Sequence, residues 1–130
     1  MKCLDTTFLI DFLRGEEAFA MKLYGQQLCT TDINVFEVFL GIQALQNQRQ
    51  REKELLAAEA LFGSIPSFPL NQHSAKSAAE IAGTLIRNGM QVDEHDCLTA
   101  AIALCNGITT IVTRNVSHFQ RITGIAVDRY

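Results

Sequence analysis

The sequence has no apolar stretch that approaches the roughly 18 consecutive residues of a membrane-spanning helix, so we expect no membrane span. We also expect no opening signal peptide, because charged residues interrupt the first apolar run at Lys2, Asp5, Asp11 and Arg14. Internal repeats, low-complexity tracts and linkers are absent as well. At 130 residues, the chain is therefore expected to form one domain over residues 1–130.

The four cysteines lack the spacing of a zinc site or a redox motif. Cys3, Cys29, Cys97 and Cys105 form no C-x-x-C pair and no zinc-like pattern with the histidines. Each lies in an apolar context, which predicts reduced, buried thiols in a cytoplasmic protein.

An excess of basic charge is also missing. The net charge of −3 argues against nucleic-acid binding by bulk charge alone. A polyanionic partner stays open, because a bound metal ion would reverse the local field. The hydrophobic fraction of 48% and charged fraction of 19% indicate a folded globular chain.

Short apolar strands alternate with helical patterns along the chain. We expect strands over residues 1–4, 28–30, 65–70, 109–112 and 126–128, with the proline-containing third strand at a sheet edge. Helices are expected over residues 8–13, 16–26, 33–44, 75–87 and 94–105, with a long helix or helical hairpin reaching residue 62. This order predicts an α/β fold with a mainly parallel central sheet of four to five short strands flanked by helices.

Three carboxylates stand in strongly apolar surroundings: Asp5, Glu37 and Asp96. Burying an ionised carboxylate without a partner costs on the order of several kcal/mol. Three of them in a small chain suggest one shared partner. A divalent cation is the simplest candidate.

The predicted topology brings these acids to one place. Ligands of open α/β sheets bind beyond the carboxyl ends of strands, where the strand order switches. Asp5 ends the first strand and Asn115 follows the strand over residues 109–112. If those strands are neighbours, both side chains point into one crevice. Asp96 in the first turn of its helix and Glu37 in the second turn of another could converge there, because helix starts lie at the same edge.

Each residue also has a simpler interpretation. Asp5 could cap the following helix, and Asp96 could complement a helix dipole. Glu37, on an apolar helix face, could pair with a buried arginine. His95 is expected to be an exposed residue at a helix start. For His118, solvent exposure is the default, although it could reach the same edge.

Four segments resemble the motifs of PIN domains in their order and spacing, across a match from Leu4 to Asp128. They are the opening Leu4–Asp11, Glu37 with Val38–Gly41, the helix Asp96–Leu104, and the closing Val112–Asn115 with Phe119. In size, the chain looks most like the VapC-type toxins of bacterial and archaeal toxin–antitoxin pairs.

The resemblance implies a metal-dependent endoribonuclease of PIN-like fold that uses Mg²⁺ or Mn²⁺. It places Asp5, Glu37 and Asp96 as acidic metal ligands and catalytic residues, with Asn115 in the fourth position. The sequence departs from the fully acidic pattern because Asn115 is neutral, and His118 falls near a position that is often acidic in relatives.

Substrate contacts are predicted around the same edge. Arg114 is placed to sit on a substrate phosphate, and Thr6 and Thr113 offer hydroxyl groups there, with turn hydrogen bonds as their simpler role.

The expected partners are an RNA substrate, a small antitoxin in a groove between the N-terminal helices, and a second copy in a homodimer. Apolar side chains for the groove or dimer face, unless they pack in the core, are Phe12, Phe19, Phe36, Phe39, Leu55 and Phe62. The alternatives are a catalytically silent binding module of RNA or protein, or a flap-type DNA nuclease. A phosphate-receiving signalling domain is disfavoured because no lysine follows Lys76.

Overall fold

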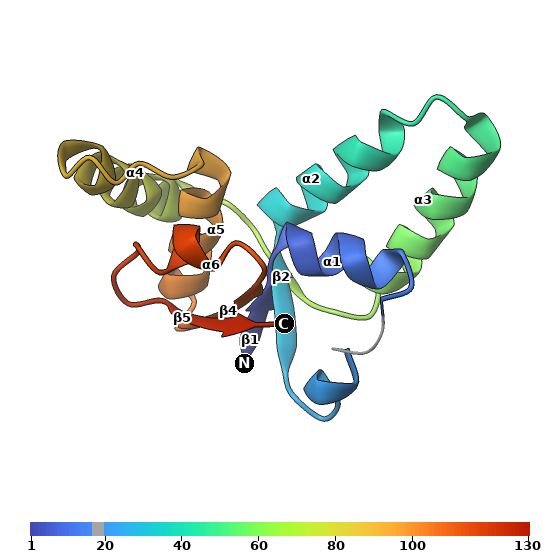
Figure 1. The fold of residues 1–130 in the computed structure, drawn as a ribbon, viewed down its shortest axis with the longest axis horizontal. Coiled ribbons are helices and arrows are strands. Elements are labelled where there is room, and N and C mark those ends of the chain that lie inside the picture. The colour runs from blue at the N-terminus through green and yellow to red at the C-terminus, as the bar shows by residue number, and fades with distance from the viewer. Residues whose placement is uncertain (17–19) are drawn as a thin grey trace.

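A central parallel sheet organises the computed structural model, which describes residues 1–16 and 20–130 (Figure 1). Its strands are β1 (Lys2–Leu4), β2 (Leu28–Thr31), β3 (Ser67–Phe68), β4 (Thr110–Thr113) and β5 (Ala126–Arg129). Every adjacent pair is parallel, and the order across the sheet is β3-β2-β1-β4-β5. The predicted α/β fold is thus confirmed, with β3 at an edge as its prolines indicated.

Strand β1 sits at the centre of the sheet, and the chain changes direction across it. It continues through β2 and β3 on one side, then returns to add β4 and β5 on the other. The register pairs Leu4 with Val112, so Asp5, directly after β1, comes beside Thr113, the last residue of β4. The gap between β1 and β4 is therefore the topological switch point at which α/β proteins bind ligands.

Helices cover both faces of the sheet (Figure 1). They are α1 (Thr6–Leu13), the 3₁₀ helix η1 (Ala20–Leu23), α2 (Asp32–Gln43), α3 (Gln48–Phe62), α4 (Gln72–Arg87), α5 (Glu94–Cys105) and α6 (Val116–Phe119). None of these described helices is long and apolar enough to cross a membrane.

The two faces are built from alternate residues of the central strands. Cys3 and Ile111 pack with side chains of α4, α5 and α6, whereas Leu4 and Val112 pack with side chains of α1, α2 and α3. Neighbouring residues of a strand point to opposite faces, so each short strand contributes to both cores. Near-continuous apolar strands are the expected sequence for a sheet buried on both sides.

Side-chain caps set where the helices begin. Asp5 caps α1, Thr31 caps α2 and Asp93 caps α5, each by accepting a hydrogen bond from a backbone N–H of the first turn. Asn71 and Ser74 form a reciprocal capping box at the start of α4. These caps fix the helix starts around the carboxyl end of the sheet.

Some predicted elements differ from the structure. The predicted helix over residues 16–26 is replaced by the short 3₁₀ helix η1, which is the only helix among the described residues of this segment. Residues 17–19 of the prediction lie outside the described residues. Gly25 ends this region with a φ of 79°, a conformation that a continuing helix does not allow. The segment from 32 to 62 is a helical hairpin, α2 and α3. Cys105 is exposed, whereas the other three thiols are buried as predicted.

Candidate active site

Asp5 is fixed at the switch point by both of its carboxylate oxygens. Oδ1 accepts hydrogen bonds from the Thr7 hydroxyl at 2.6 Å and from the backbone N–H groups of Thr7 and Phe8 at 2.9 and 3.3 Å. Oδ2 accepts from the Thr113 hydroxyl at 2.6 Å. The Asp5 side chain therefore caps α1 and also lies at the end of β1. Its role as a helix cap and its place at the edge of the predicted crevice are compatible.

Two threonine hydroxyls also connect Asp5 to the loop after β4. Thr7 Oγ1 accepts the backbone N–H of Arg114 at 3.1 Å, and Thr113 Oγ1 accepts the backbone N–H of Asn115 at 2.9 Å. Each hydroxyl thus donates to Asp5 and accepts from the β4–α6 connection. The position of Asn115 relative to Asp5 is set by these two relays.

Asp96 lies in the first turn of α5 and pairs with a histidine. His118 Nδ1, from α6, is 2.7 Å from Asp96 Oδ2. Burial raises the pKa of Asp96; His118 opposes this shift, while the nearby charges of Asp5 and Asp93 add to it. Burial likewise raises the pKa of Asp5, against hydrogen bonds from Thr113 and Thr7. The negative charge of Asp5 therefore disfavours ionisation of Asp96.

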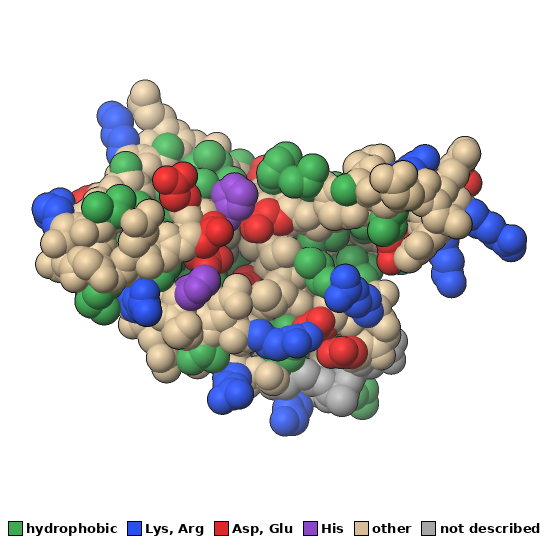
Figure 2. Space-filling view, turned by 45° about the horizontal axis from the view of Figure 1, so that its top comes forward, with side chains coloured by type: hydrophobic (Ala, Val, Ile, Leu, Met, Phe, Trp, Pro, Cys, Tyr) green, Lys and Arg blue, Asp and Glu red, His purple; other side chains and the backbone are tan. Residues whose placement is uncertain are grey.

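Glu37 reaches the same edge from α2 through Thr6, the neighbour of Asp5. The Thr6 hydroxyl donates to Glu37 Oε1 at 3.0 Å and accepts from the Asn34 amide at 3.1 Å. His95 Nδ1 lies 3.5 Å from Glu37 Oε2. Figure 2 shows acidic side chains and histidines gathered in a hollow at the centre of one face of the molecule.

Two interpretations from the sequence need correction here. Glu37 does not lie on a buried apolar face, since its side chain is 28% exposed and Leu40, on the same helix, is 55% exposed. Its partners are a threonine and a histidine and not a buried arginine. His118 is not simply solvent-exposed either, because it contacts Asp96. His95 is exposed at a helix start, as expected.

The predicted substrate-contacting residues occupy different settings. Thr113 is fully buried against Asp5, so its side chain has no exposed surface and orients the acid instead. Thr6 is half-buried and bonded to Glu37. The Arg114 side chain is 53% exposed and pairs with Asp11. Asn115 is half-buried, and its side chain makes no capping hydrogen bond to α6.

The donor set suits a hard divalent cation in its chemistry, because carboxylate and amide oxygens are the ligands Mg²⁺ prefers. However, among residues 1–16 and 20–130, no three His, Cys, Asp or Glu side chains are already grouped to hold an ion. Each acid has its own protein partners, so the shared partner inferred from the sequence is not needed to satisfy them. An incoming ion would compete with those hydrogen bonds and relieve the repulsion between Asp5 and Asp96.

Residues that sequence reasoning passed over support this site. Asn34 is 2% exposed and holds Thr6, and the Thr31 hydroxyl donates to the Asn34 side chain at 2.7 Å. Asn34 precedes Glu37 by three residues, so an amide on the same helix face was the available signal. Asp11 and Tyr130, which hold Arg114, are 119 residues apart and gave no local signal.

Comparison with known proteins places this geometry in a family. The PIN domain family model matches residues 2–125. The chain belongs to the PIN domain family. Among curated PIN relatives, it is 31% identical to ribonuclease VapC19 of Mycobacterium tuberculosis over 124 residues, 92% of each chain. It is 27% identical to ribonuclease VapC1 of Rickettsia felis, over 95% of this chain and 92% of the relative.

Solved structures show the same PIN fold. A DNA-bound VapBC complex from Salmonella typhimurium contains a chain that superposes with a TM-score of 0.86 at 23% identity, covering 98% of this chain and 96% of that one. VapBC-1 from nontypeable Haemophilus influenzae gives a TM-score of 0.85 at 24% identity, with the same coverage. The resemblance stated from the motifs is confirmed at the level of family and fold.

Proposed function

We propose that this PIN domain is a metal-dependent endoribonuclease of the VapC type, the toxin of a toxin–antitoxin pair. The observation that carries the proposal is the set of acids held at the switch point between β1 and β4, in a chain whose curated relatives are named ribonucleases. The reaction is hydrolysis of an RNA phosphodiester by water.

The residues that would hold Mg²⁺ or Mn²⁺ are Asp5, Glu37, Asp96 and Asn115. When bound, such an ion acidifies a water molecule and neutralises charge on the phosphate. Asp5 is kept in one orientation by Thr7 and Thr113, which limits the cost of arranging the site. Asn115 contributes an oxygen without charge, so the site carries three negative charges.

The bond changes follow from water as the nucleophile. The water oxygen forms a bond to phosphorus, the bond from phosphorus to the 3′ oxygen breaks, and that oxygen takes up a proton. The products are a 5′-phosphate and a 3′-hydroxyl. No side-chain nucleophile is required, so the chain needs only to position water, ion and phosphate.

A cleavage assay tests this proposal directly. Purified protein is incubated with single-stranded RNA, structured RNA and a flap DNA, each with Mg²⁺ or Mn²⁺ and with EDTA. RNA cleavage that EDTA stops, with ends sequenced as 5′-phosphate and 3′-hydroxyl, is the expected result. Cleavage of the flap DNA alone would identify a DNA nuclease, and RNA binding without cleavage would identify a silent module.

Metal binding should also stabilise the protein. Mg²⁺ or Mn²⁺ at 100 times its dissociation constant is expected to add about 2.7 kcal/mol to the free energy of unfolding, because only the folded chain assembles the acids. Thermal unfolding with and without the ion measures this shift. Asp96→Asn should lose most of it, and an equal shift in wild type and variant would contradict the assignment of Asp96.

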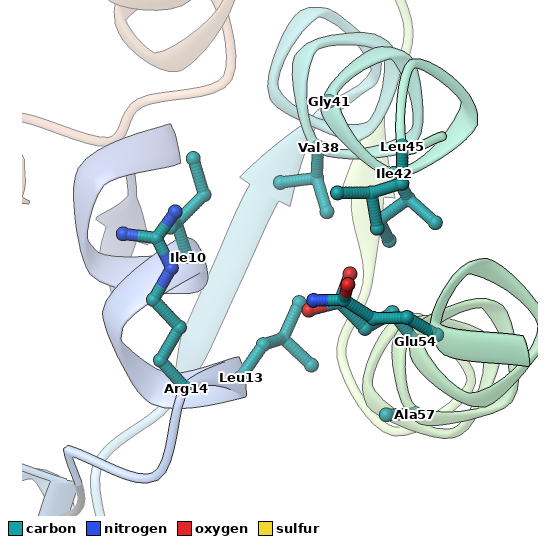
Figure 3. Close-up of a pocket in the computed structure, with 10 residues that line it drawn as sticks. Ile10, Leu13, Arg14, Val38, Gly41, Ile42, Leu45, Glu54 and Ala57 are labelled. Atoms are coloured by element: carbon teal, nitrogen blue, oxygen red, sulfur yellow. The ribbon is translucent and has the colours of Figure 1, made fainter. Parts of the chain in front are cut away.

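An apolar groove between α1, α2 and α3 is the proposed antitoxin site. Ile10 and Leu13 line it from α1, Val38 and Ile42 from α2, and Ala57 from α3 (Figure 3). Arg14 and Glu54 add opposite charges to the lining, which suits an apolar segment flanked by charged residues. The solved structures of similar fold described above are VapBC complexes, and this likeness supports a small protein partner.

None of the described apolar residues predicted for that groove lines it. Phe12, Phe39, Leu55 and Phe62 pack against the α1–α3 core, and Phe19 lies outside the described residues. Phe36 and Leu40 are each 55% exposed on α2. We propose that these two belong to the homodimer face. Three buried free thiols support the proposed cytoplasmic location, where thiols stay reduced.

Gly41 offers a specific test of the groove. It lines the groove, and a Cβ atom there would meet no atom within 4 Å. Gly41→Met should therefore fill the groove and abolish co-purification with a small antitoxin protein, if the neighbouring gene encodes one, while cleavage of RNA persists. Gly41→Ala, which adds one methyl group, is the matched control and should still co-purify. Retention of the partner by Gly41→Met would place the antitoxin elsewhere.

A further inference from the structure

A second hollow borders the acidic crevice and contains two arginines. Its lining residues are Thr7, Ile10, Asp11, Arg14, Arg114 and Asn115. Asn115 belongs to the proposed ion site, so the hollow is continuous with the place where a phosphodiester would be cut. Figure 2 shows basic side chains next to acidic ones beside the central hollow on this face.

One edge of the Arg114 guanidinium is held by Asp11. Nε donates to Asp11 Oδ2 at 2.7 Å, and Nη2 donates to the same oxygen. Nε and Nη2 form one side of the planar group, and among the described residues Nη1 makes no hydrogen bond. The Arg114 side chain is 53% exposed, and its Nη1 end faces no described hydrogen-bond partner that a ligand would have to displace. Guanidinium edges match pairs of phosphate oxygens.

Asp11 and Tyr130 fix that orientation. The Tyr130 hydroxyl donates to Asp11 Oδ2 at 2.6 Å, and its ring packs edge-on against Phe8 with centroids 5.2 Å apart. Asp11 is only 6% exposed. Burial raises the pKa of Asp11, but hydrogen bonds from Arg114 and Tyr130 outweigh it and hold the pKa below its usual value. The carboxylate is therefore charged at neutral pH and keeps Arg114 in place.

Arg14 supplies a second positive charge, which acts electrostatically on Asp11. It follows α1 as its C-cap, is exposed, and its side chain makes no hydrogen bond or ion pair with any described residue. Glu16 Oε2 approaches Arg114 Nη2 at 3.7 Å, but the Glu16 side chain is 66% exposed. Such an exposed contact is weak, so a phosphate can displace it.

We propose that Arg14 and Arg114 form a subsite for an RNA backbone phosphate next to the one that is cleaved, with Asp11 and Tyr130 as positioning residues. This inference rests on the proposed cleavage of RNA. Contacts to phosphate place a strand without reading its bases. The subsite would therefore set the register of the RNA across the acids and contribute little to sequence preference.

Binding of a short single-stranded RNA in EDTA, measured by fluorescence anisotropy over a range of salt concentrations, tests the subsite without turnover. Arg14→Gln and Arg114→Gln should each weaken binding roughly five-fold, about 1 kcal/mol. Each should also make the slope of log K against log salt shallower by about 0.7. Glu16→Gln should tighten binding, since it removes a competitor of the phosphate.

Tyr130→Phe separates positioning from charge. It keeps the ring against Phe8 and both arginines, so the salt slope should stay near that of wild type while affinity falls by a smaller factor. In cleavage assays, Arg14→Gln should raise KM and leave kcat nearly unchanged. Arg87→Gln, on α4 away from α1 (Figure 1), is the matched control and should bind like wild type.

The outcomes distinguish this inference from the proposed function. If wild type cleaves RNA and both arginine variants keep its affinity and salt slope, the subsite is wrong and the nuclease stands. Loss of antitoxin binding alone in these variants would also overturn the subsite, in favour of an acidic partner residue. If wild type neither binds nor cleaves RNA, the proposed function itself fails. Melting temperatures confirm that each variant is folded.

Discussion

Asp5→Asn and Asp96→Asn should each reduce RNA cleavage by about 10³-fold or more while the protein stays folded. Both positions supply charge to the proposed ion site, and an ion that activates water and neutralises phosphate lowers the barrier by several kcal/mol. Each 1.36 kcal/mol is about ten-fold in rate. Single-turnover cleavage at saturating Mn²⁺ measures the loss in the chemical step.

The fold should survive because asparagine has nearly the shape of aspartate at both positions and can keep the helix cap at position 5. At position 5, an amide oxygen can still accept the N–H groups of Thr7 and Phe8, and Asn caps helices as well as Asp does. Removal of charge also helps. The pKa values of Asp5 and Asp96 are higher in the folded protein than in the unfolded chain. The free energy of unfolding of the metal-free protein therefore falls as pH rises from the unfolded-state pKa through the folded-state pKa of each group.

The metal-free variants should therefore melt at or above the wild-type temperature at neutral pH. Asp128→Asn is a useful control, because Asp128 pairs with Lys2 in β1 and lies outside the site. It should cleave RNA like wild type. Full activity in Asp5→Asn or Asp96→Asn would overturn the assignment of that acid, and loss of the folded state in either would show that its first role is structural.

Phe119→Ala should have the largest effect on stability, about 3–5 kcal/mol. Phe119 has no exposed surface and is among the largest fully buried side chains, packed with residues of α4, α5 and β4. Removal of the ring leaves a cavity in that core. Since small domains have only about 5–15 kcal/mol in total, the melting temperature should fall by roughly 10 °C or more.

A comparison with Phe119→Leu separates the structural from the catalytic role of this motif residue. Leucine retains most of the apolar volume, so this variant should cleave RNA normally at temperatures where it is folded. Leu56→Ala, at a side chain that is 75% exposed on α3, should change the free energy of unfolding by less than about 1 kcal/mol. Equal losses in Phe119→Ala and Leu56→Ala, by urea unfolding, would contradict the packing seen here.

Local signals in the sequence predicted most of the fold and the location of the site. Apolar runs and turn residues located the strands, and the position of Asp5 after one strand and Asn115 after another located the crevice. The register of β1 against β4 was not encoded locally, and only that register brings Thr113 to Asp5. Thr113 was therefore predicted as a substrate contact although it is buried.

The partners of the acids were also beyond sequence reasoning. His118 and Asp96 come from different helices, and their contact depends on how α6 packs against α5. Asp11 lies in α1, and its partner Arg114 comes 103 residues later in the chain. Glu37 was assigned to a buried face because its neighbours are apolar, yet Leu40 beside it remains exposed.

The order of strands has a consequence for when the enzyme can act. Asp5 is synthesised 108 residues before Thr113, the β4 residue whose hydroxyl donates to the second carboxylate oxygen of Asp5. While the polypeptide is still growing on the ribosome, Asp5, Glu37 and Asp96 are therefore present before Thr113 can orient Asp5. Under the proposed function, RNA cleavage would begin only after β4 has paired with β1 and the Thr113 hydroxyl has bonded to Asp5.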